Sequence, residues 1–437
     1  MQEKLINNFL RISNIPRESS HEEKIANYFI NIAKENNLDY YKDEYNNVLI
    51  KKKGNRKSLP IAIQAHFDMV CKKEKNSTHD FNKNGIDVII DNNRVTAKDT
   101  TLGADQGVGL AIMLTIMEDN TLNTPDIEFL FTIEEETTFN GVVKYPYHLV
   151  NSKTLINLDN CHDNNVIVGS DGDIVSLHLY TGKLIKTKLP SYKITIDKSI
   201  GGNSGDNIEL SKNNAINTMA NILKEKNIYL KSINGGTTEN DIASSCEVII
   251  NTNENINDIF NNIDCKIETI KNDMCFSKED TNNIINEIIE LKSGFISNKN
   301  SSANLGVIKT NNNEINIYYV IRSMNEQELN NLYQESISLN NKFITKELYS
   351  DSIWNKNNNS NLLKEYKHIY YKEYKEYPKE DINHGCSECA AINKRISNLD
   401  MISIGANIDY FHTTKEVTYI DSWIKIYNLL TKLLEII

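Results

Sequence analysis

The chain contains no apolar run approaching the roughly 18 residues needed to cross a membrane, so we expect no membrane span. Residues 1–16 predict a short helix. They have neither the long apolar stretch nor the cleavage signature of a signal peptide. Positive charge is also in short supply, because the net charge is −11. This balance argues against nucleic acid as a partner, since phosphate backbones require basic protein surfaces.

The cysteines do not form a disulfide framework. Seven of them, an odd number, are scattered along the chain: Cys71, Cys161, Cys246, Cys265, Cys275, Cys386 and Cys389. This usage is typical of reduced thiols and predicts a cytoplasmic protein. The last two form a CxxC pair, but no second pair completes a zinc site. Burial as small apolar side chains is therefore favoured over a metal or thiol-redox role.

A chain of 437 residues is too long for one compact core, so two domains are expected. In the first part of the chain, short apolar β-branched runs alternate with helical patterns. This alternation predicts an α/β sheet that is buried on both faces. The expected strands are 46–52, 61–65, 127–133 and 154–158, and the expected helices are 107–119 and 23–36, the latter opened by a capping box from Ser20 to Glu23.

The pattern changes at residue 187 to Asn-rich strands, helices and a hairpin, which predicts an inserted α+β domain. Its expected elements include strands 192–197, 227–233 and 246–252, helices 208–226 and 325–341, and a hairpin at 306–323. From residue 349 the chain is expected to return to the first domain and to close with a helix. The predicted organisation is therefore residues 1–186, an insertion at 187–348, and residues 349–437.

Potential metal ligands follow several of the apolar runs. The clearest segments are IAIQAHFDM (61–69), TLGADQGVG (101–109), EFLFTIEEE (128–136), TLINLDN (154–160) and ISIGANIDYFHTT (402–414). In open α/β sheets, ligands bind outside the carboxyl ends of the strands, so these side chains are expected to converge. Two His, two Asp and one Glu, with two spare carboxylates, form a ligand set for two divalent cations, and such sites activate water for hydrolysis.

Each segment also allows a simpler interpretation. His66 and Asp68 alternate along a strand, so Asp68 can hydrogen-bond the second ring nitrogen of a metal-bound His66, but a chance HxD on a loop gives the same pattern. Asp105 suits either a helix N-cap or a carboxylate bridging two ions. Among Glu134, Glu135 and Glu136, one can bind metal while another serves as a general base. Asp159 and His412 are weak candidates individually, because a lone His is more often structural.

Nine blocks of sequence, in their order and spacing, carry a family resemblance over nearly the whole chain. They are IPRESSHEEKI (15–25), QAHFDMVC (64–71), TTLGADQGVGLA (100–111), FTIEEETTFNGV (131–142), LINLDN (155–160), GGNSGDNI (201–208), INGG (233–236), HGCSECA (384–390) and SIGANIDYFHTTKEVTYI (403–420). The chain resembles the aminoacyl-histidine dipeptidases, the carnosinase-type Xaa-His dipeptidases of bacteria. These belong to the co-catalytic zinc exopeptidases, which include carboxypeptidase G.

The resemblance implies a phosphorylase-like α/β catalytic domain with an inserted α+β lid domain, and it leaves a homodimer through the lid open. It implies a small peptide substrate and two divalent ions, zinc with manganese or cobalt as substitutes. It implies that one ion is bound by His66, Asp105 and Asp159, and the other by Asp105, Glu136 and His412. It implies that Glu135 is the general base and that Asp68 orients His66. The residues that it implies for substrate binding are Asn203, Asn240, His384 and Glu388.

Two departures from the family pattern concern the expected lid. Asn203 stands where the family has a His in its GGHSG motif, and Glu239 stands where an Arg is usual. The expected function is therefore a di-metal exopeptidase that cleaves dipeptides of the Xaa-His type or a broader range. Two alternatives remain: hydrolysis of another small amide such as an N-acyl amino acid, or peptide binding by a catalytically weakened relative.

Overall fold

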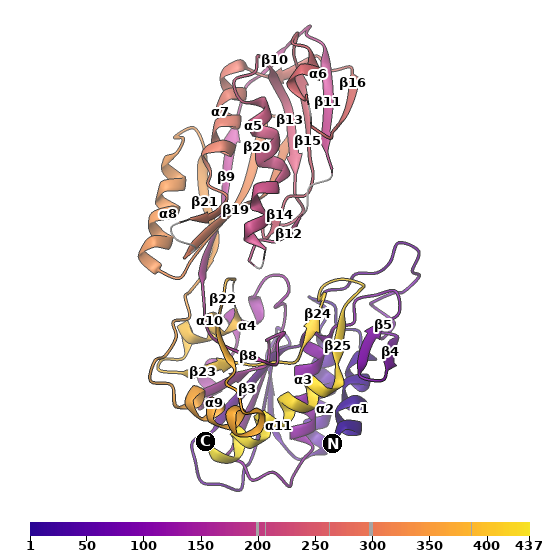
Figure 1. Cartoon of the computed structure of the whole chain (residues 1–437), viewed down its shortest axis with the longest axis vertical. Coiled ribbons are helices and arrows are strands. Elements are labelled where there is room, and N and C mark those ends of the chain that lie inside the picture. The colour runs from indigo at the N-terminus through magenta and orange to yellow at the C-terminus, as the bar shows by residue number, and fades with distance from the viewer. Residues whose placement is uncertain (198–200, 206, 262, 297–299, 386) are drawn as a thin grey trace. The chain divides into compact units, whose positions relative to one another are not determined.

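The computed structural model describes residues 1–197, 201–205, 207–261, 263–296, 300–385 and 387–437. The chain forms two compact units (Figure 1). Unit 1 comprises Met1–Gly169, Trp354–Ile382 and Ser387–Ile437, and unit 2 comprises Ser170–Ile353 and Asn383–Cys386. The expected α/β class with an inserted α+β domain is confirmed. Unit 2 extends beyond the expected bounds of 187–348, because the strand β9 (Gly172–Thr181) pairs with strands of that unit.

Unit 1 is built on a large mixed sheet. Its strand order is β1 (Asp39–Lys42), β2 (Val48–Lys52), β6 (Ile127–Thr132), β3 (Ile61–His66), β7 (Thr154–Asn157), β23 (Asp400–Ser403), β8 (Asn165–Ser170) and β22 (Lys379–Asn383). The central strands β6, β3, β7 and β23 are parallel, whereas β1 and β2 are antiparallel additions at one side. The parallel strands therefore end at one edge of the sheet, where α/β proteins bind ligands.

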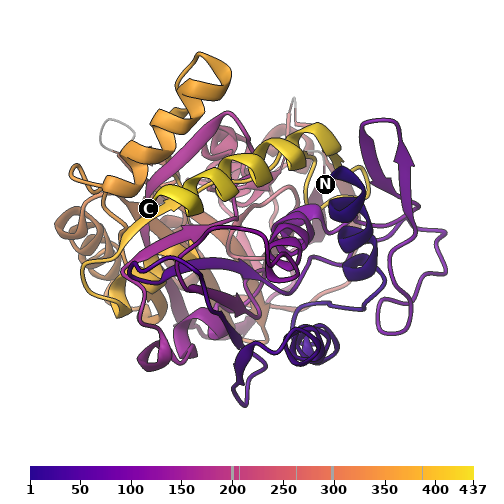
Figure 2. The same ribbon diagram turned by 90° about the horizontal axis from the view of Figure 1, so that it is seen from below.

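Helices cover both faces of this sheet. One core contains residues of α1 (Gln2–Ser13), α2 (Glu23–Glu35), α3 (Ala104–Met117), α9 (Asn361–Tyr374) and α11 (Ile420–Ile436), and the other contains residues of α4 (Asn140–Lys144) and α10 (Glu388–Arg395). Alternate strand residues serve the two cores: Val48 and Ile50 join the first, and Leu49 between them joins the second. Figure 2 shows α11, in yellow, beside α9, in orange, and α1, in indigo.

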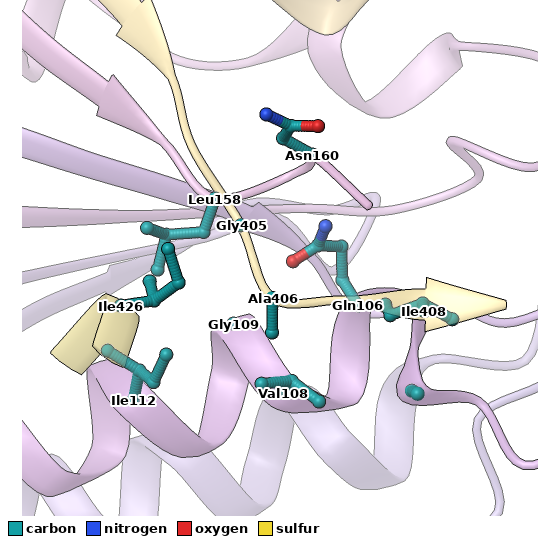
Figure 3. Close-up of a pocket in the computed structure, with 11 residues that line it drawn as sticks. Gln106, Val108, Gly109, Ile112, Leu158, Asn160, Gly405, Ala406, Ile408 and Ile426 are labelled. Carbon is teal, nitrogen blue, oxygen red and sulfur yellow. The ribbon is translucent and has the colours of Figure 1, made fainter. Parts of the chain in front are cut away.

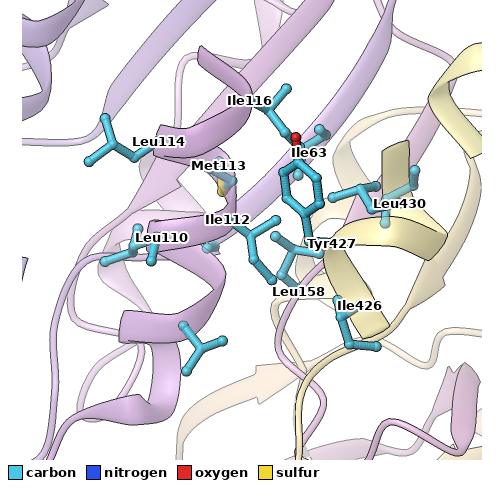
Figure 4. Close-up of a cluster of buried hydrophobic side chains, with 14 of the residues drawn as sticks. Ile63, Leu110, Ile112, Met113, Leu114, Ile116, Leu158, Ile426, Tyr427 and Leu430 are labelled. Atoms are coloured by element: carbon cyan, nitrogen blue, oxygen red, sulfur yellow. The ribbon is translucent and has the colours of Figure 1, made fainter. Parts of the chain in front are cut away.

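Helix α3 is the centre of the larger core. Every one of its residues is buried, and its side chains are apolar almost all round, which is the pattern of a core helix rather than a surface helix. Figure 4 shows Ile112 and Ile116 of α3 among Ile63 of β3 and Tyr427 of α11. The backbone of Asp105, in the first turn, is not helical. The core thus fixes the body of the helix, whereas the backbone of its first turn departs from helical geometry at Asp105.

A small antiparallel sheet completes unit 1. It consists of β24 (Ile408–Asp409), β25 (Val417–Tyr419), β5 (Arg94–Ala97) and β4 (Val88–Asp91). The loop between β24 and β25 carries His412, which has a positive φ of 60°. Pairing of β25 with β5 anchors one end of this loop. The position of His412 is therefore fixed by the small sheet rather than by the large one.

Unit 2 is an antiparallel sheet with helices packed against it (Figure 1). Its strand order is β16 (Lys266–Ile270), β11 (Ser191–Ile196), β15 (Cys246–Asn251), β13 (Tyr229–Gly235), β19 (Ser301–Asn311), β20 (Glu314–Ser323), β9 and β21 (Ile344–Asp351), and β18 (Gly294–Ile296) pairs with β19. The helices are α5 (Ala215–Leu223), α6 (Ile256–Ile259), α7 (Lys278–Glu290) and α8 (Glu326–Ser338). The short strands β10 (Leu184–Lys186) and β17 (Met274–Phe276) pair, as do β12 (Gly202–Asn203) and β14 (Asp241–Ile242).

Two local predictions were wrong. The helix expected at 208–226 is divided into η2 (Ile208–Asn213) and α5, because the side chain of Asn214 caps α5 by accepting the N–H groups of Ile216 and Asn217. The capping box expected from Ser20 is not formed, because Ser20 has a positive φ of 68° and its hydroxyl donates to Glu134 instead. In both cases a polar side chain forms a hydrogen bond that the sequence pattern did not indicate.

Cys386 of the CxxC pair lies outside the described residues, and Cys389 is a buried free thiol. Within the described part of the chain, no helix has the length and apolar character that a membrane crossing requires.

We predict that Ile116→Ala lowers the free energy of unfolding by about 2–5 kcal/mol, because it removes buried methyl groups and leaves a cavity in the core around α3. Ile116 is fully buried in that core. Leu59→Ala, at a position that is 72% exposed, is the matched control and should change the stability by less than about 0.5 kcal/mol. Denaturant unfolding of both variants measures the difference, and equal effects would contradict the described packing.

Candidate metal centre

Six side chains of unit 1 gather at the carboxyl ends of the parallel strands. They are His66 at the end of β3, Asp105 in the first turn of α3, Glu135 and Glu136 after β6, Asp159 after β7, and His412 in the loop between β24 and β25. The edge of the sheet brings four of them together, and the first turn of α3 and the loop of the small sheet supply the other two. All six lie in the same unit, so their geometry does not depend on unit 2.

Asp105 lies between the two imidazoles. Its Oδ1 is 3.2 Å from Nε2 of His66, and its Oδ2 is 3.5 Å from Nε2 of His412. The His66 nitrogen is also 3.8 Å from Oδ1 of Asp159, and the His412 nitrogen is 2.9 Å from Oε1 of Glu136. Each oxygen of Asp105 therefore faces a different set of nitrogen and oxygen atoms, which is the geometry of a carboxylate shared by two sites.

Two triads within this cluster have the spacing of a metal site, with potential ligand atoms within 4.8 Å of one another. They are His66, Glu135 and Asp159, and His66, Asp105 and Glu136. These triads share His66, whereas the family resemblance implies that Asp105 is shared. Neither triad contains His412, and the division implied by the resemblance does not use Glu135 as a ligand.

The three consecutive glutamates differ in direction. Glu134 has a positive φ of 54°, and its carboxylate accepts hydrogen bonds from Ser20, Thr138 and Asn140, away from the cluster. Glu136 contacts His412, and Glu135 belongs to the triad with His66. The left-handed residue at 134 therefore separates one outward carboxylate from two that face the site.

Asp68 joins the loops that carry these ligands. Its Oδ1 is 3.3 Å from Nδ1 of His66 and accepts the backbone N–H of Glu135 at 3.0 Å. Its Oδ2 accepts the backbone N–H of Glu136 at 3.1 Å and the hydroxyl of Ser19 at 2.8 Å. The side chain is fully buried. Asp68 thus faces the ring of His66 on one side and holds the turn after β6 on the other.

Arg17 is a structural residue of the site that the sequence analysis missed. Its buried guanidinium donates to the carbonyl oxygens of Phe67 and Asp68 at 2.9 and 2.7 Å, and also to that of Gly103. It therefore ties the end of β3 to the segment before Asp105. The block IPRESSHEEKI contained this arginine, but an arginine that binds backbone carbonyls has no sequence signature of its own.

Gln106 holds Asp159 from the side of α3. Its Nε2 donates to Oδ1 of Asp159 at 2.6 Å, and its Oε1 is buried without a hydrogen-bond partner. Figure 3 shows Gln106 in a small pocket with Leu158, Gly109 and Asn160. A Cβ atom at Gly109 would lie 2.2 Å from the Gln106 Oε1, so glycine is required there for the side chain to reach Asp159. This contact was also missed from the sequence.

The electrostatics of the cluster show an excess of buried negative charge. Burial and the charge of Asp105 raise the pKa of Asp159 to about 8. Burial and the charge of Asp159 raise the pKa of Glu135 well above its usual value. Burial lowers the pKa of His412, but its hydrogen bonds to Asp105 and Glu136 outweigh this effect and raise the pKa to about 11. The acids are therefore stabilised as anions only where a positive charge is close to them.

This donor set fits divalent cations. Imidazole nitrogens and carboxylate oxygens are ligands for zinc and for its neighbours in the first transition row. The side chains are withdrawn from water, with exposed fractions from 1% for His66 to 33% for His412. Cations placed among the acids would offset the repulsion that raises the pKa of Glu135 and Asp159. The cluster is therefore a candidate metal centre.

Three of the four residues expected to bind substrate lie in unit 2. Asn203 is exposed on β12, and its Oδ1 accepts the N–H of Gly205 at 2.7 Å. Asn240 accepts a hydrogen bond from Arg322 at 2.8 Å through its Oδ1. Nδ1 of His384 is 2.8 Å from Oδ2 of the buried Asp171, whereas its Nε2 has no partner.

Glu388 is the fourth of these residues, and it lies in unit 1. It is 1% exposed, and its Oε2 accepts hydrogen bonds from Gln64 at 2.5 Å and Thr132 at 3.0 Å. Burial raises its pKa to about 7. Gln64 in turn accepts a hydrogen bond from Asn157, whose Oδ1 accepts the N–H of Asp159. Glu388 is thus connected to the metal-centre residues through the strands beneath them.

Comparisons with known proteins find dipeptidases that are similar to the whole chain. The chain is 28% identical to the cytosol non-specific dipeptidase of Escherichia coli strain K12, over 98% of this chain and 96% of that protein. Its structure matches an aminoacylhistidine dipeptidase from Vibrio alginolyticus with a TM-score of 0.79 and 26% identity, covering 99% and 96% of the two chains. It matches the M20 family metallo-carboxypeptidase Sso-CP2 from Sulfolobus solfataricus in fold, with a TM-score of 0.57, 14% identity and coverage of 100% and 99%. No family model matches the sequence.

Because imidazole and carboxylate side chains converge where an α/β sheet binds its ligands, the molecule is of the metallohydrolase class. Its likeness to both dipeptidases covers nearly the full length of each. The chain is a homologue of the cytosol non-specific and aminoacylhistidine dipeptidases, and it shares the fold of an M20 family metallo-carboxypeptidase.

We predict that Glu22→Gln stabilises the metal-free protein above neutral pH. Oε1 of Glu22 accepts the N–H groups of Ser20 and Glu134, and the amide oxygen of Gln can keep both bonds. Burial and the charge of Asp68 raise the pKa of Glu22 to about 7 from an ordinary 4.5. The folded state therefore binds the proton more tightly, and the parent loses stability as the pH rises between these values.

The gain in free energy of unfolding on Glu22→Gln should accordingly be small at the lower end of this range. It should reach about 1 kcal/mol at about pH 8, after allowance for solvent screening. Denaturant unfolding of the parent and the variant, both treated with chelator, at about pH 5 and about pH 8 checks it. A gain that does not grow with pH would contradict the assignment.

Proposed function

We propose that the chain is a dipeptidase that works with two divalent cations, zinc with manganese or cobalt as substitutes. The observation that carries the proposal is the convergence of two imidazoles and four carboxylates in unit 1, with Asp105 between the imidazoles. In this assignment His66, Asp105 and Asp159 hold one ion, and Asp105, Glu136 and His412 hold the other. The names of the two dipeptidase homologues support a dipeptide as the substrate.

When bound, the two ions would lower the pKa of a water molecule and polarise the scissile carbonyl group. Glu135 is the general base: it accepts a proton from the attacking water and later donates it to the leaving amine. Asp68, whose Oδ1 lies 3.3 Å from Nδ1 of His66, is assigned the role of orienting that ring, and it fixes the backbone of Glu135 through a hydrogen bond. The chain needs no serine or cysteine nucleophile for this reaction.

Substrate contacts are assigned to Asn203, Asn240, His384 and Glu388, and unit 2 is assigned the role of a lid. The side-chain amide nitrogen of Asn203 carries two N–H donors for this purpose, whereas its Oδ1 accepts the N–H of Gly205. We place the protein in the cytoplasm, which is supported by the free thiols of Cys71, Cys246, Cys265, Cys275 and Cys389 and by the name of the Escherichia coli relative.

We predict that the purified parent protein binds about two zinc ions per chain, as the five assigned ligand side chains, with Asp105 shared, would allow. His412→Ala should lower the affinity for one ion by at least about 100-fold, because it removes a ligand, while the other ion stays bound. His384→Ala is the matched control, since this His lies in unit 2. Elemental analysis and competition with a metal-binding dye measure both quantities. Parent protein that holds no ion after reconstitution would refute the function.

We predict that Glu135→Gln and Glu136→Gln differ in kind. Glu135→Gln should lower kcat for dipeptides by roughly 100- to 10,000-fold with metal content unchanged, because it removes a base and not a ligand. Glu136→Gln should also lower metal content. The measurement is turnover of a panel of dipeptides and N-acyl amino acids with zinc, manganese or cobalt, beside elemental analysis.

Reversed behaviour of the two variants would show that their roles are exchanged. Turnover of N-acyl amino acids without turnover of any dipeptide would show that the substrate is another amide and not a dipeptide.

A further inference from the structure

We infer that Glu416 is the positioning residue that holds two ligands of the metal centre, Asp105 and His412, in register. The inference rests on the proposed function for the assignment of these two ligands. Glu416 lies four residues beyond His412, just before β25, and it is only 3% exposed. Its side chain extends from the His412 loop to the segment that precedes Asp105.

The carboxylate of Glu416 accepts a series of backbone N–H groups from that segment. Oε2 accepts from Leu102 at 2.8 Å and from Gly103 at 3.0 Å. Oε1 accepts from Ala104 at 2.7 Å and, at the longer distance of 3.5 Å, from Asp105 itself. Hydrogen bonds from N–H groups to a buried carboxylate are stronger than those between neutral partners, so the segment is held firmly.

The same segment is also held by a hydrogen bond from Arg17 and by close packing around Gly103. Arg17 donates to the carbonyl oxygen of Gly103. The N–H group of Gly103, like those of its neighbours, donates to Glu416. A Cβ atom on Gly103 would lie 2.6 Å from the sulfur of Met69 and 2.7 Å from Nη2 of Arg17, and the φ of Gly103 is +68°. The segment before Asp105 is therefore fixed through its N–H groups by an anion and through a carbonyl group by a cation.

The contacts of Asp105 with the two imidazoles depend on the position of this backbone segment. Each of its oxygens faces a different imidazole, at 3.2 and 3.5 Å, so a small rotation of its backbone moves both contacts at once. His412 lies in the loop between the short paired strands β24 and β25, and Glu416 lies at the end of the same loop. Glu416 connects the two loops directly, and its loss would let them move independently. A residue that only capped α3 would contribute stability but would not affect the spacing of the ligands.

The experiment compares Glu416→Gln with Glu128→Gln in the full-length chain. Glu128 is a matched control because it is also buried and also accepts backbone N–H groups, from Asn151 and Ser152, but it lies near the start of β6, at the end opposite Glu135. Zinc affinity is titrated with a competing dye, and the midpoint of thermal unfolding is measured with and without zinc. Neither readout requires turnover.

We expect Glu416→Gln to weaken zinc binding by about 10- to 100-fold, the usual effect of losing a residue that supports metal ligands, and Glu128→Gln to leave it unchanged. Zinc should also raise the unfolding midpoint of Glu416→Gln less than that of the parent. If Glu416→Gln does not fold, Glu416→Asp, which keeps the charge on a shorter side chain, must show the same loss. Parent-like zinc affinity in the Glu416 variant, or an equal loss in both variants, overturns the inference. Zinc binding by the parent without dipeptide turnover would refute the proposed function and leave this inference standing.

Discussion

The structure of unit 1 depends on placing four carboxylates side by side where they are largely withdrawn from water. Burial and mutual repulsion raise the pKa of Glu135, Glu136 and Asp159, so the cluster is unfavourable unless positive charge is close. In the metal-free chain, His66 and His412 supply part of that charge when protonated, and they would lose it on binding metal. Divalent ions are the natural source of the rest. The arrangement of the surrounding elements is best understood as a means of holding these acids together in spite of their repulsion.

The acids are held mainly through the backbone. Asp68 accepts the N–H groups of Glu135 and Glu136, and Arg17 donates to carbonyl groups on either side of the cluster. Neither residue needs to touch a metal ion to be essential for its site. Because these contacts lie directly at the ends of packed strands, the ligands inherit the rigidity of the sheet, which is what a preorganised catalytic site requires.

Much of the large sheet could be predicted from the sequence, because its parallel strands are short apolar β-branched runs. Strands expected at 61–65, 127–133 and 154–158 are β3, β6 and β7, within one residue at each end. Strand β9 could not be predicted in the same way. Its polar residue His178 is buried, with Nδ1 3.0 Å from Oε1 of Glu287. A polar side chain whose partner is more than a hundred residues away interrupts the apolar alternation, and the sequence does not show the compensation.

The ligand types of the candidate site could likewise be predicted, but the contacts that orient them could not. The direction of each glutamate in 134–136 depends on the positive φ of Glu134, which no spacing rule indicates. Gln106 was indistinguishable from an ordinary helix residue, although it holds Asp159 and requires glycine at position 109. Contacts of this kind arise from the tertiary arrangement of segments far apart in the sequence, so they become visible only once the chain is folded.

The two units differ in how freely their candidate residues can change. Side chains of the metal centre lie within networks of buried hydrogen bonds, and replacing one of them leaves a charge or a polar group without a partner, at a cost of about 1–3 kcal/mol or more. Asn203, by contrast, is exposed, and its one described side-chain hydrogen bond is local, to Gly205. A substitution of Asn203 would therefore disturb the fold less than a substitution among the clustered acids and histidines of unit 1.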